Sequence, residues 1–328
     1  MALTKKRLVA IMFVLTIAFL VLLLYLPESV TGQRDENFLL YGSKLMFLAV
    51  TAAIGTIFIL ILFFRKEYVR AQINTFQRFK YYLALLVKRD FVTKYRKSIL
   101  GVLWSFLNPL LIMLVMTIVF SYLFRFEIEF FPAYLLSGML IYNFFNESTT
   151  LAMSSIIINE GVIKKIYVPK YMFPLARVLS SLVNVLFSLV AFLIVFFVVG
   201  VPFNWTLFLI PIPIFYTFVF SMGVAMLMSS LAVFFRDLTY LYGIFTLLLM
   251  YLTPLFWPVS MLDPDGILVN IIGLNPIFQY VLYFRNLALW GTIPDLWANM
   301  VCIGYALLAF CGGTAVFMRQ QDRYLLSL

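Results

Sequence analysis

The amino-acid sequence predicts an all-α, polytopic membrane protein, and two observations lead to this fold class. First, 64% of its 328 residues are hydrophobic and 12% are charged, with a mean hydropathy of +1.03, which lies far outside the range of soluble globular domains. Second, several apolar runs are continuous over about twenty residues, the length that a helix needs to cross a bilayer. A membrane β-barrel would instead show segments of about ten residues with alternating polarity.

The N-terminal part, residues 1–70, is predicted to be an additional module of two spans. Its first apolar run, Leu8 to Leu26, follows three basic residues and reaches about 28 Å as a helix. A cleaved signal peptide is the alternative, but Tyr25 to Glu28 contain no small-residue cleavage site, so we expect a retained anchor. The second run is Leu45 to Phe64.

Residues 71–100 are predicted to form a basic amphipathic helix that lies flat at the cytoplasmic interface. Ten Lys or Arg residues occur between positions 65 and 98. The apolar residues among them recur at spacings of three and four, which places them on one helical face: Phe76, Phe79, Leu83, Leu86 and Val87. A basic flank beside an apolar stripe is typical of a helix at a membrane surface.

Residues 101–328 are predicted to form a core of six spans. We expect them near residues 101–124, 132–155, 174–200, 206–233, 240–262 and 297–318. With both termini in the cytoplasm, 20 of the 24 Lys and Arg residues lie on the cytoplasmic side, as the positive-inside rule requires. The apolar stretches within 263–296 are too short to span and are interrupted at Asn275-Pro276. They are expected to be two short helices that re-enter from the outer face.

The residues that the sequence lacks disfavour several classes of function. It contains no histidine and no P-loop motif, so histidine-based metal centres are excluded and any ATP hydrolysis must occur in another chain. Glu147 is the one acid well inside an apolar run, whereas ion-coupled carriers usually place charged groups at mid-membrane. Because no base or nucleophile is suitably grouped, we do not expect an enzyme. The net charge of +10 reflects membrane orientation, and no nucleic-acid partner is expected.

A short basic segment separates two long apolar runs between Ile156 and Pro174, with proline breaks at Pro169 and Pro174. One interpretation is an ordinary positive-inside loop. The other is a compact cytoplasmic element on which a soluble motor can push, its extent fixed by the prolines.

A mixed aromatic and amide surface is predicted on one span. It combines two aromatic residues with two amides: Tyr142, Asn143, Phe145 and Asn146. Aromatic ring faces can cover the apolar side of a sugar, and amides can bind its hydroxyls. A passage for sugars would favour this mixture. The alternative is that these residues pack in the core or face lipid.

A series of short motifs follows in order along roughly residues 85–328. They are Lys88-Arg89-Asp90, Lys94 to Trp104, Asn108-Pro109, Tyr134 to Gly138, Tyr142 to Phe145, Lys164 to Pro169, Leu179 to Val183, Arg236-Asp237, Leu274 to Pro276 and Phe284-Arg285. In this order they resemble the membrane subunits of ABC exporters that move lipid-linked polysaccharides, the permeases for O-antigen, capsule and teichoic acid. The family core has six spans, so residues 1–70 have no counterpart in the family pattern.

The resemblance implies a homodimer with two ABC ATPase subunits in the bacterial cytoplasmic membrane, moving a lipid-linked polysaccharide outward among the membrane lipids. ATP and Mg²⁺ would be bound by the ATPase, so this chain is expected to hold no cofactor. The family's coupling helix falls on residues 159–171, with the ATPase contacts Lys164, Lys165, Tyr167, Val168 and Pro169.

The resemblance also implies an entrance, a channel and a gate. At a lateral entrance beside the Leu100-Gly101 turn, the carrier phosphate would be received by Arg89, Lys94, Arg96, Lys97 and Gly101, since arginine can bind a phosphate with two hydrogen bonds. Simple anchoring to anionic lipid is the alternative role of these cations. The channel would be lined in part by Tyr142, Asn143, Phe145 and Asn146. The extracellular gate, near 263–296, would include Asn275, Pro276, Tyr280 and Arg285.

Two other classes of function stay open. One is the permease half of an ABC exporter for a drug or a small lipid, and the other is a membrane scaffold without transport. Gene neighbourhood separates them: a P-loop ATPase with glycosyltransferases favours polysaccharide export, an ATPase alone favours a small amphiphile, and a scaffold has neither.

Overall fold

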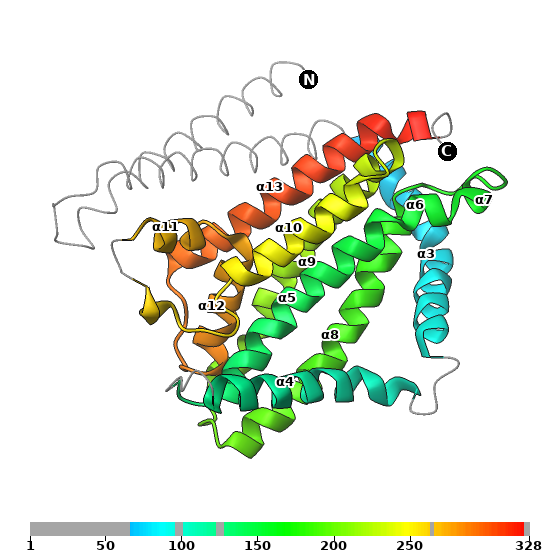
Figure 1. Cartoon of the computed structure of the whole chain (residues 1–328). Coiled ribbons are helices and arrows are strands. Elements are labelled where there is room, and N and C mark those ends of the chain that lie inside the picture. Colours follow the sequence, from blue (N-terminus) through cyan, green and yellow to red (C-terminus); the bar gives the residue numbers. More distant parts are fainter. Residues whose placement is uncertain (1–65, 96–100, 123–127, 263–265, 325–328) are drawn as a thin grey trace, which may run out of the picture.

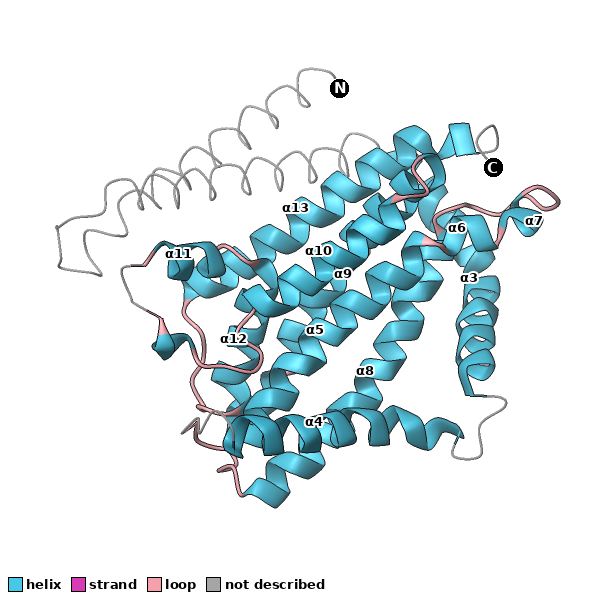
Figure 2. Ribbon diagram, in the orientation of Figure 1, coloured by secondary structure: helices cyan, strands magenta, loops and turns pink. Residues whose placement is uncertain are grey.

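The computed structural model describes residues 66–95, 101–122, 128–262 and 266–324. These residues are mostly helical and contain no strand (Figure 2), which confirms the all-α prediction for this part of the chain. The two predicted spans of residues 1–70 lie outside the described residues.

Four segments of the described residues are long and apolar enough to cross a membrane: Gly101–Phe120, Met172–Val199, Trp205–Phe234 and Leu296–Arg323. Their main helices are α4 (Trp104–Tyr122), α8 (Met172–Val199), α9 (Pro211–Phe234) and α13 (Leu296–Gln320). Short 3-10 turns extend them, η1 (Gly101–Leu103) and η2 (Trp205–Leu209) at their starts and η4 (Gln321–Arg323) after α13.

Helix α5 (Phe131–Met153) packs against α8, α9, α10 and α12 near the centre of the bundle (Figure 1). Its 23 residues are long enough to span, but the polar residues of its second half, Glu147 among them, lower its hydropathy. Because α5 is buried along most of its length, Glu147, Ser148 and Thr149 find hydrogen-bond partners inside the protein, as polar groups within spans do.

The bundle has two distinct ends. Helix α5 ends and α8 starts beside two single-turn helices, α6 (Ser155–Ile158) and α7 (Glu160–Ile163), and we call this the α7 end. Two further short helices, α11 (Ile267–Gly273) and α12 (Pro276–Ala288), lie at the opposite end in Figure 1, which we call the α12 end.

The closest helix pair, α9 and α13, depends on two glycines. A Cβ atom at Gly223 would overlap the backbone at Ala309, and one at Gly313 would overlap the backbone of Gly223. Small residues at such positions let two helix backbones approach within a membrane. This contact holds α13 along α9 over a long interface.

Helix α3 (Lys66–Tyr95) overlaps the basic helix predicted at 71–100, of which residues 96–100 lie outside the described residues, and packs beside α8 (Figure 1). That it lies flat at the cytoplasmic interface stays a prediction. Leu83 and Leu86 are buried, whereas Lys80 and Lys88 are exposed, so the helix is amphipathic as expected. Near its end, the Phe91 ring stacks on Phe187 of α8 with 5.9 Å between centroids.

The predicted span at 240–262 is too long. Helix α10 comprises only Leu238–Leu252, and a 3-10 turn, η3 (Val259–Met261), follows. The helix stops at Thr253 because Pro254 comes next: a proline disfavours helical backbone at the residue before it and removes a hydrogen-bond donor.

The two short helices expected between 263 and 296 are confirmed as α11 and α12, while their re-entry from the membrane surface stays a prediction. The Asn275 side chain caps α12 by accepting a 3.0 Å hydrogen bond from Ile277 N, with Pro276 at the first helical position, as helix starts favour. The single coupling helix expected at 159–171 is wrong. This region instead contains α7, which ends at Ile163, followed by a turn and a loop that includes Pro169.

Candidate functional site

A cluster of charged side chains joins α3 to α8 at the α7 end. Arg177 Nη1 lies 3.0 Å from Asp90 Oδ2, and Arg89 Nη2 lies 3.3 Å from Asp90 Oδ1. The Asp90 side chain is 10% exposed and that of Arg177 is 16% exposed. The pair is therefore partly shielded from water, where an ionic attraction is stronger than at an open surface.

Asn159, between α6 and α7, extends this cluster. Its Oδ1 accepts a 3.4 Å hydrogen bond from Arg89 Nη1, and its Nδ2 donates to the Ser155 carbonyl at 2.7 Å. The side chains Arg89, Asp90, Asn159 and Arg177 form what we call the Asp90 cluster. It connects the α6–α7 region to both α3 and α8, so a displacement of one can reach the others.

Glu147 of α5 provides a second connection at this end. Its Oε1 accepts hydrogen bonds of 2.8 Å from Lys94 Nζ of α3 and from Asn184 Nδ2 of α8. A carboxylate within an apolar helix is tolerated when it is paired and hydrogen-bonded. The one acid singled out inside an apolar run thus joins three helices.

The coupling segment, residues 154–171, presents a small exposed tip. Tyr167 is 89% exposed and Ile166 is 60% exposed, and the segment projects from the bundle (Figure 1). Of the predicted ATPase contacts, Lys164, Lys165 and Tyr167 are exposed and Pro169 is partly exposed. The prediction that Val168 contacts the ATPase is corrected, because Val168 is 8% exposed and belongs to the core. The chain turns back toward α8 after Tyr167.

The other side of the coupling segment is held by the C-terminal end of α13. Lys170 Nζ donates to the Gln321 carbonyl and lies 5.7 Å from the centroid of the Tyr324 ring. Burial raises the pKa of Tyr324 to about 12, so its hydroxyl is neutral at physiological pH. The segment is thus anchored at both ends, with its tip in solvent.

The residues predicted to receive the carrier phosphate are only partly brought together. Arg89 and Lys94 lie at the α7 end, but they already pair with Asp90 and Glu147. Gly101 has a φ of +48° with no atom near a hypothetical Cβ, so glycine is favoured here by the left-handed backbone of the turn. Arg96 and Lys97 lie outside the described residues.

The four residues predicted to line a channel separate into two pairs. Tyr142 is buried and donates a 2.7 Å hydrogen bond to the Thr246 carbonyl of α10, and Phe145 packs on Phe220 of α9 with 5.6 Å between centroids. Within this chain these two aromatic residues pack helices together and form no open surface. Asn143 is exposed and Asn146 partly exposed, so only the amides are available to a passage.

A second cluster surrounds Arg285 at the α12 end, where the arginine is 1% exposed. Its donors reach neutral acceptors: Nη1 donates to the Pro254 carbonyl at 2.8 Å, Nη2 to the carbonyls of Tyr134 at 3.1 Å and Leu255 at 3.2 Å, and Nε to Ser137 Oγ at 3.3 Å. None of the ion pairs among the described residues includes Arg285.

The Tyr134 ring and Gly138 complete what we call the Arg285 cluster. Arg285 Cζ lies 3.4 Å from the centroid of the Tyr134 ring, a cation–π contact that is strongest when water is excluded. A Cβ at Gly138 would lie 2.8 Å from Arg285 Nη2, so only glycine leaves room for the guanidinium. The guanidinium of Arg285 is thus balanced by carbonyl dipoles and the face of the Tyr134 ring, where a buried arginine usually pairs with a carboxylate.

The Arg285 cluster holds the two proline breaks of this end against α5. Arg285 of α12 binds the carbonyls on either side of the break after α10, at Pro254 and Leu255. Asn275 Nδ2 donates to Thr253 Oγ1 at 2.8 Å, which joins the break before α12 to the same place. Motifs that are far apart in the sequence therefore meet around one cation.

Tyr280 is not at an accessible surface of the predicted gate. It is fully buried, its hydroxyl donates to the Cys302 carbonyl at 3.1 Å, and its ring packs on Phe220. Tyr280 therefore cannot touch a second copy of the chain in this conformation, because α12 directs its side chain toward α9 and α13. Leu274, between α11 and α12, is 68% exposed.

Sequence reasoning missed most of the partners in both clusters. Asp90 and Arg177 come from separate helices, and the acceptors of Arg285 are largely main-chain carbonyls, which carry no residue signature. Gly138 was the one readable signal, since a glycine inside a helix needs a packing reason. No group of Asp, Glu or Cys side chains in the described part is arranged to hold a metal ion.

Comparisons with known proteins give a family and similar proteins. A family model described as an ABC-2 type transporter matches residues 81–289, the region that contains both clusters. A protein named O-antigen export system permease protein RfbA from Klebsiella pneumoniae is 30% identical over 244 residues, which is 74% of this chain and 93% of that protein. A protein of the same name from Myxococcus xanthus is 25% identical over 242 residues, again 74% and 93% of the two chains.

Proposed function

We propose, from the premise that this chain belongs to the ABC-2 type transporter family, that it is the membrane-spanning subunit of an ATP-driven polysaccharide exporter. Two copies would form a channel, two ABC ATPase subunits would bind beneath it, and a lipid-linked polysaccharide would pass from the cytoplasmic to the outer face. The observation that carries this proposal is the similarity to permeases named for O-antigen export over 93% of their length.

The separate ATPase follows from the sequence. The chain has no P-loop motif, whose backbone and lysine bind the phosphates of ATP. ATP and Mg²⁺ would therefore be bound by the partner subunits, and this chain would convert their movement into opening and closing of the channel.

The distribution of charge supports placing the α7 end in the cytoplasm. The basic residues of α3 and the coupling segment lie there, together with Arg236, Arg319 and Arg323 near the adjoining helix ends. In the described part, the α12 end carries one basic residue, the buried Arg285. This asymmetry matches the positive-inside rule and supports an outer position for α11 and α12.

The Asp90 cluster offers a route from the ATPase to the channel. The exposed tip at Ile166 and Tyr167 is the part of the coupling segment that a partner can contact. Its base is linked through Asn159 and Arg89 to Asp90, and through Asp90 to Arg177. Movement of the tip would therefore shift α3 and α8 together, provided that the ATPase binds the tip differently in its two nucleotide states.

The Arg285 cluster supports α11 and α12 as the outer gate. A long polymer cannot be enclosed in a pocket, so its passage must be continuous during transport and closed at rest. The short helices are broken segments of the kind tolerated where protein surrounds them. Arg285 fixes α12 to α5, which would leave α11 and Leu274 as the part free to move.

A complementation experiment tests the proposal. A strain that synthesises the polysaccharide but lacks the genes for both this chain and its ATPase would regain surface polymer when the two wild-type subunits are supplied together. Either subunit alone should leave lipid-linked polymer on the cytoplasmic side. Full surface polymer in the absence of the chain, with loss only of a small lipid from the outer leaflet, would contradict the proposal and favour export of a small amphiphile.

A further inference from the structure

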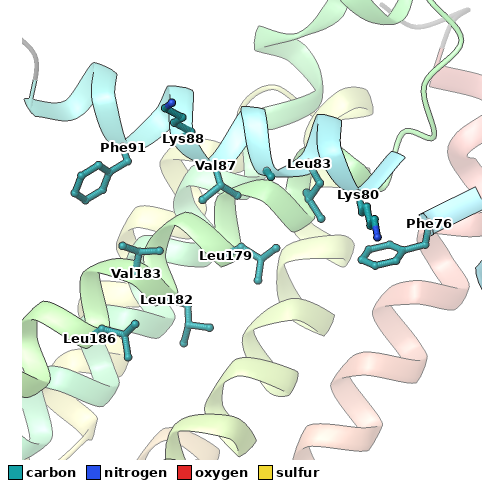
Figure 3. Close-up of a pocket in the computed structure, with 11 residues that line it drawn as sticks. Phe76, Lys80, Leu83, Val87, Lys88, Phe91, Leu179, Leu182, Val183 and Leu186 are labelled. Atoms are coloured by element: carbon teal, nitrogen blue, oxygen red, sulfur yellow. The ribbon is translucent and has the colours of Figure 1, made fainter. Parts of the chain in front are cut away.

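A groove between α3 and α8 is not used by the function proposed above (Figure 3). Its volume is about 590 Å³, within the range of small-molecule sites. The walls are almost entirely hydrocarbon, and the main residues are Phe76, Leu83, Val87, Leu179, Val183 and Leu186. Such a groove suits a long apolar chain and provides few partners for a polar ligand.

Two lysines line the groove, Lys80 and Lys88. In Figure 3 the Lys80 ammonium lies on the side of α3 that carries Leu83 and Val87, whereas the Lys88 ammonium points away from α8. Within the described residues neither lysine forms an ion pair, unlike Arg89 and Lys94. Lys80 can therefore bind an anion without the loss of an existing contact.

The dimensions fit a lipid that enters from the membrane surface. From Leu179 to Leu186 the groove follows α8 for about 10 Å, which lies within one leaflet of a hydrocarbon core about 30 Å thick. Lys80 lies toward the end where α8 begins, and Phe91 lies toward Leu186 (Figure 3). A headgroup at Lys80 would thus continue into a chain that runs between α3 and α8 toward Leu186.

We propose that this groove binds one anionic phospholipid, with its phosphate at Lys80 and an acyl chain between α3 and α8. Charge complementarity selects the headgroup, because a lysine at the membrane surface attracts anionic lipid. The hydrocarbon walls select a ligand with a chain. The lipid would fill the space between the two helices and so support α3 at the position where the Asp90 cluster joins it to α8. The site is independent of what the protein transports.

Native mass spectrometry of the delipidated full chain tests the site. Phosphatidylglycerol and phosphatidylcholine with the same acyl chains would be titrated separately, and we expect one phosphatidylglycerol to be retained at concentrations where phosphatidylcholine is lost. Lys80→Gln should weaken phosphatidylglycerol binding about fivefold and leave phosphatidylcholine unchanged. Lys88→Gln removes the same charge from the same helix and should change the affinity less than twofold.

Val183→Trp tests the apolar part, since it fills the groove and should lower the retention of both lipids. Val190→Trp, at an exposed position of α8 outside the groove, is its control. If Val183→Trp does not fold, the two lysine variants decide alone.

Three results would overturn the proposal. Equal effects of Lys80→Gln and Lys88→Gln would indicate diffuse attraction to the helix. Displacement of phosphatidylglycerol by glycerol phosphate would indicate a headgroup site without a chain. Displacement by an equimolar polyprenyl phosphate would assign the groove to an isoprenoid carrier.

Discussion

At the scale of single residues, Arg285 shows how a cation can be stable in an apolar bundle without an acid. Its four hydrogen bonds go to three carbonyls and a hydroxyl, and the Tyr134 ring covers one face. The family resemblance predicted that Arg285 belongs to the gate. It could not predict the acceptors, because main-chain carbonyls carry no residue signature, whether they lie after a proline break, as at Pro254, or within a helix, as at Tyr134.

Gly138→Ala should destabilise the protein by about 1–3 kcal/mol, since the new methyl group would meet the guanidinium and the packed helix cannot move away freely. Arg285→Met should cost a similar amount or more, because it leaves buried carbonyls unsatisfied. In the double variant the two effects should be clearly less than additive, as expected for residues in contact. Unfolding by denaturant in detergent measures the free energy.

Gly243→Ala is the matched control for the glycine. It also lies within a helix, but nothing lies within 4 Å of its hypothetical Cβ, so alanine there should be neutral or stabilising. Additive effects of Gly138→Ala and Arg285→Met would show that the close approach of these residues has no energetic consequence. Arg285→Lys keeps the charge but not the planar fork, and should behave like Arg285→Met.

At the scale of elements, the sequence was most informative where a cap or a proline marks a boundary. The break between the two short helices was predicted at Asn275-Pro276, and α12 starts at Pro276 with Asn275 as its cap, as helix starts favour. The predicted span at 240–262 failed because its apolar composition continues through Thr253 and Pro254, and the proline outweighs the composition. The prediction of one helix at 159–171 also failed, since α7 ends at Ile163 and a turn and loop follow before Pro169.

Ile166→Asp combined with Tyr167→Asp should abolish transport and stimulation of the ATPase by the permease, with expression and insertion unchanged. Both side chains are exposed, so the charges need not enter the fold, but they would weaken an apolar contact with a partner. Transport and ATPase activity are measured in membranes that contain both subunits.

Two comparisons make this result specific to the tip. Val168→Asp should reduce the amount of folded protein, because Val168 is buried. Phe235→Asp, at another exposed position near the α7 end, should leave coupling largely intact. Normal ATPase stimulation by the Ile166/Tyr167 variant at normal expression would show that the motor contacts a different element.

At the scale of the whole molecule, composition predicted the class of protein, while the orientation inferred from charge stays a prediction. Hydropathy identifies spans because a bilayer requires every backbone group to be satisfied within a helix. The neighbours of each helix could not be predicted in this way, since lipid-facing and protein-facing residues are both apolar. The aromatic residues Tyr142 and Phe145 show this, as they pack α5 against α10 and α9 although sequence reasoning assigned them to a passage.

The most direct test of the central claim is transport by purified components. The chain and its ATPase would be reconstituted into proteoliposomes that carry lipid-linked polysaccharide in the outer leaflet. Transporters inserted in the inverted orientation have their ATPase subunits outside the vesicle, on the same side as the polymer and the added ATP. We expect ATP to move the polymer into the lumen, as measured by protection from an added glycosidase, with no protection when the permease is omitted or carries the Ile166→Asp and Tyr167→Asp changes. Unchanged glycosidase sensitivity with the wild-type pair, despite active ATP hydrolysis and correct insertion, would contradict the claim that this chain exports polysaccharide.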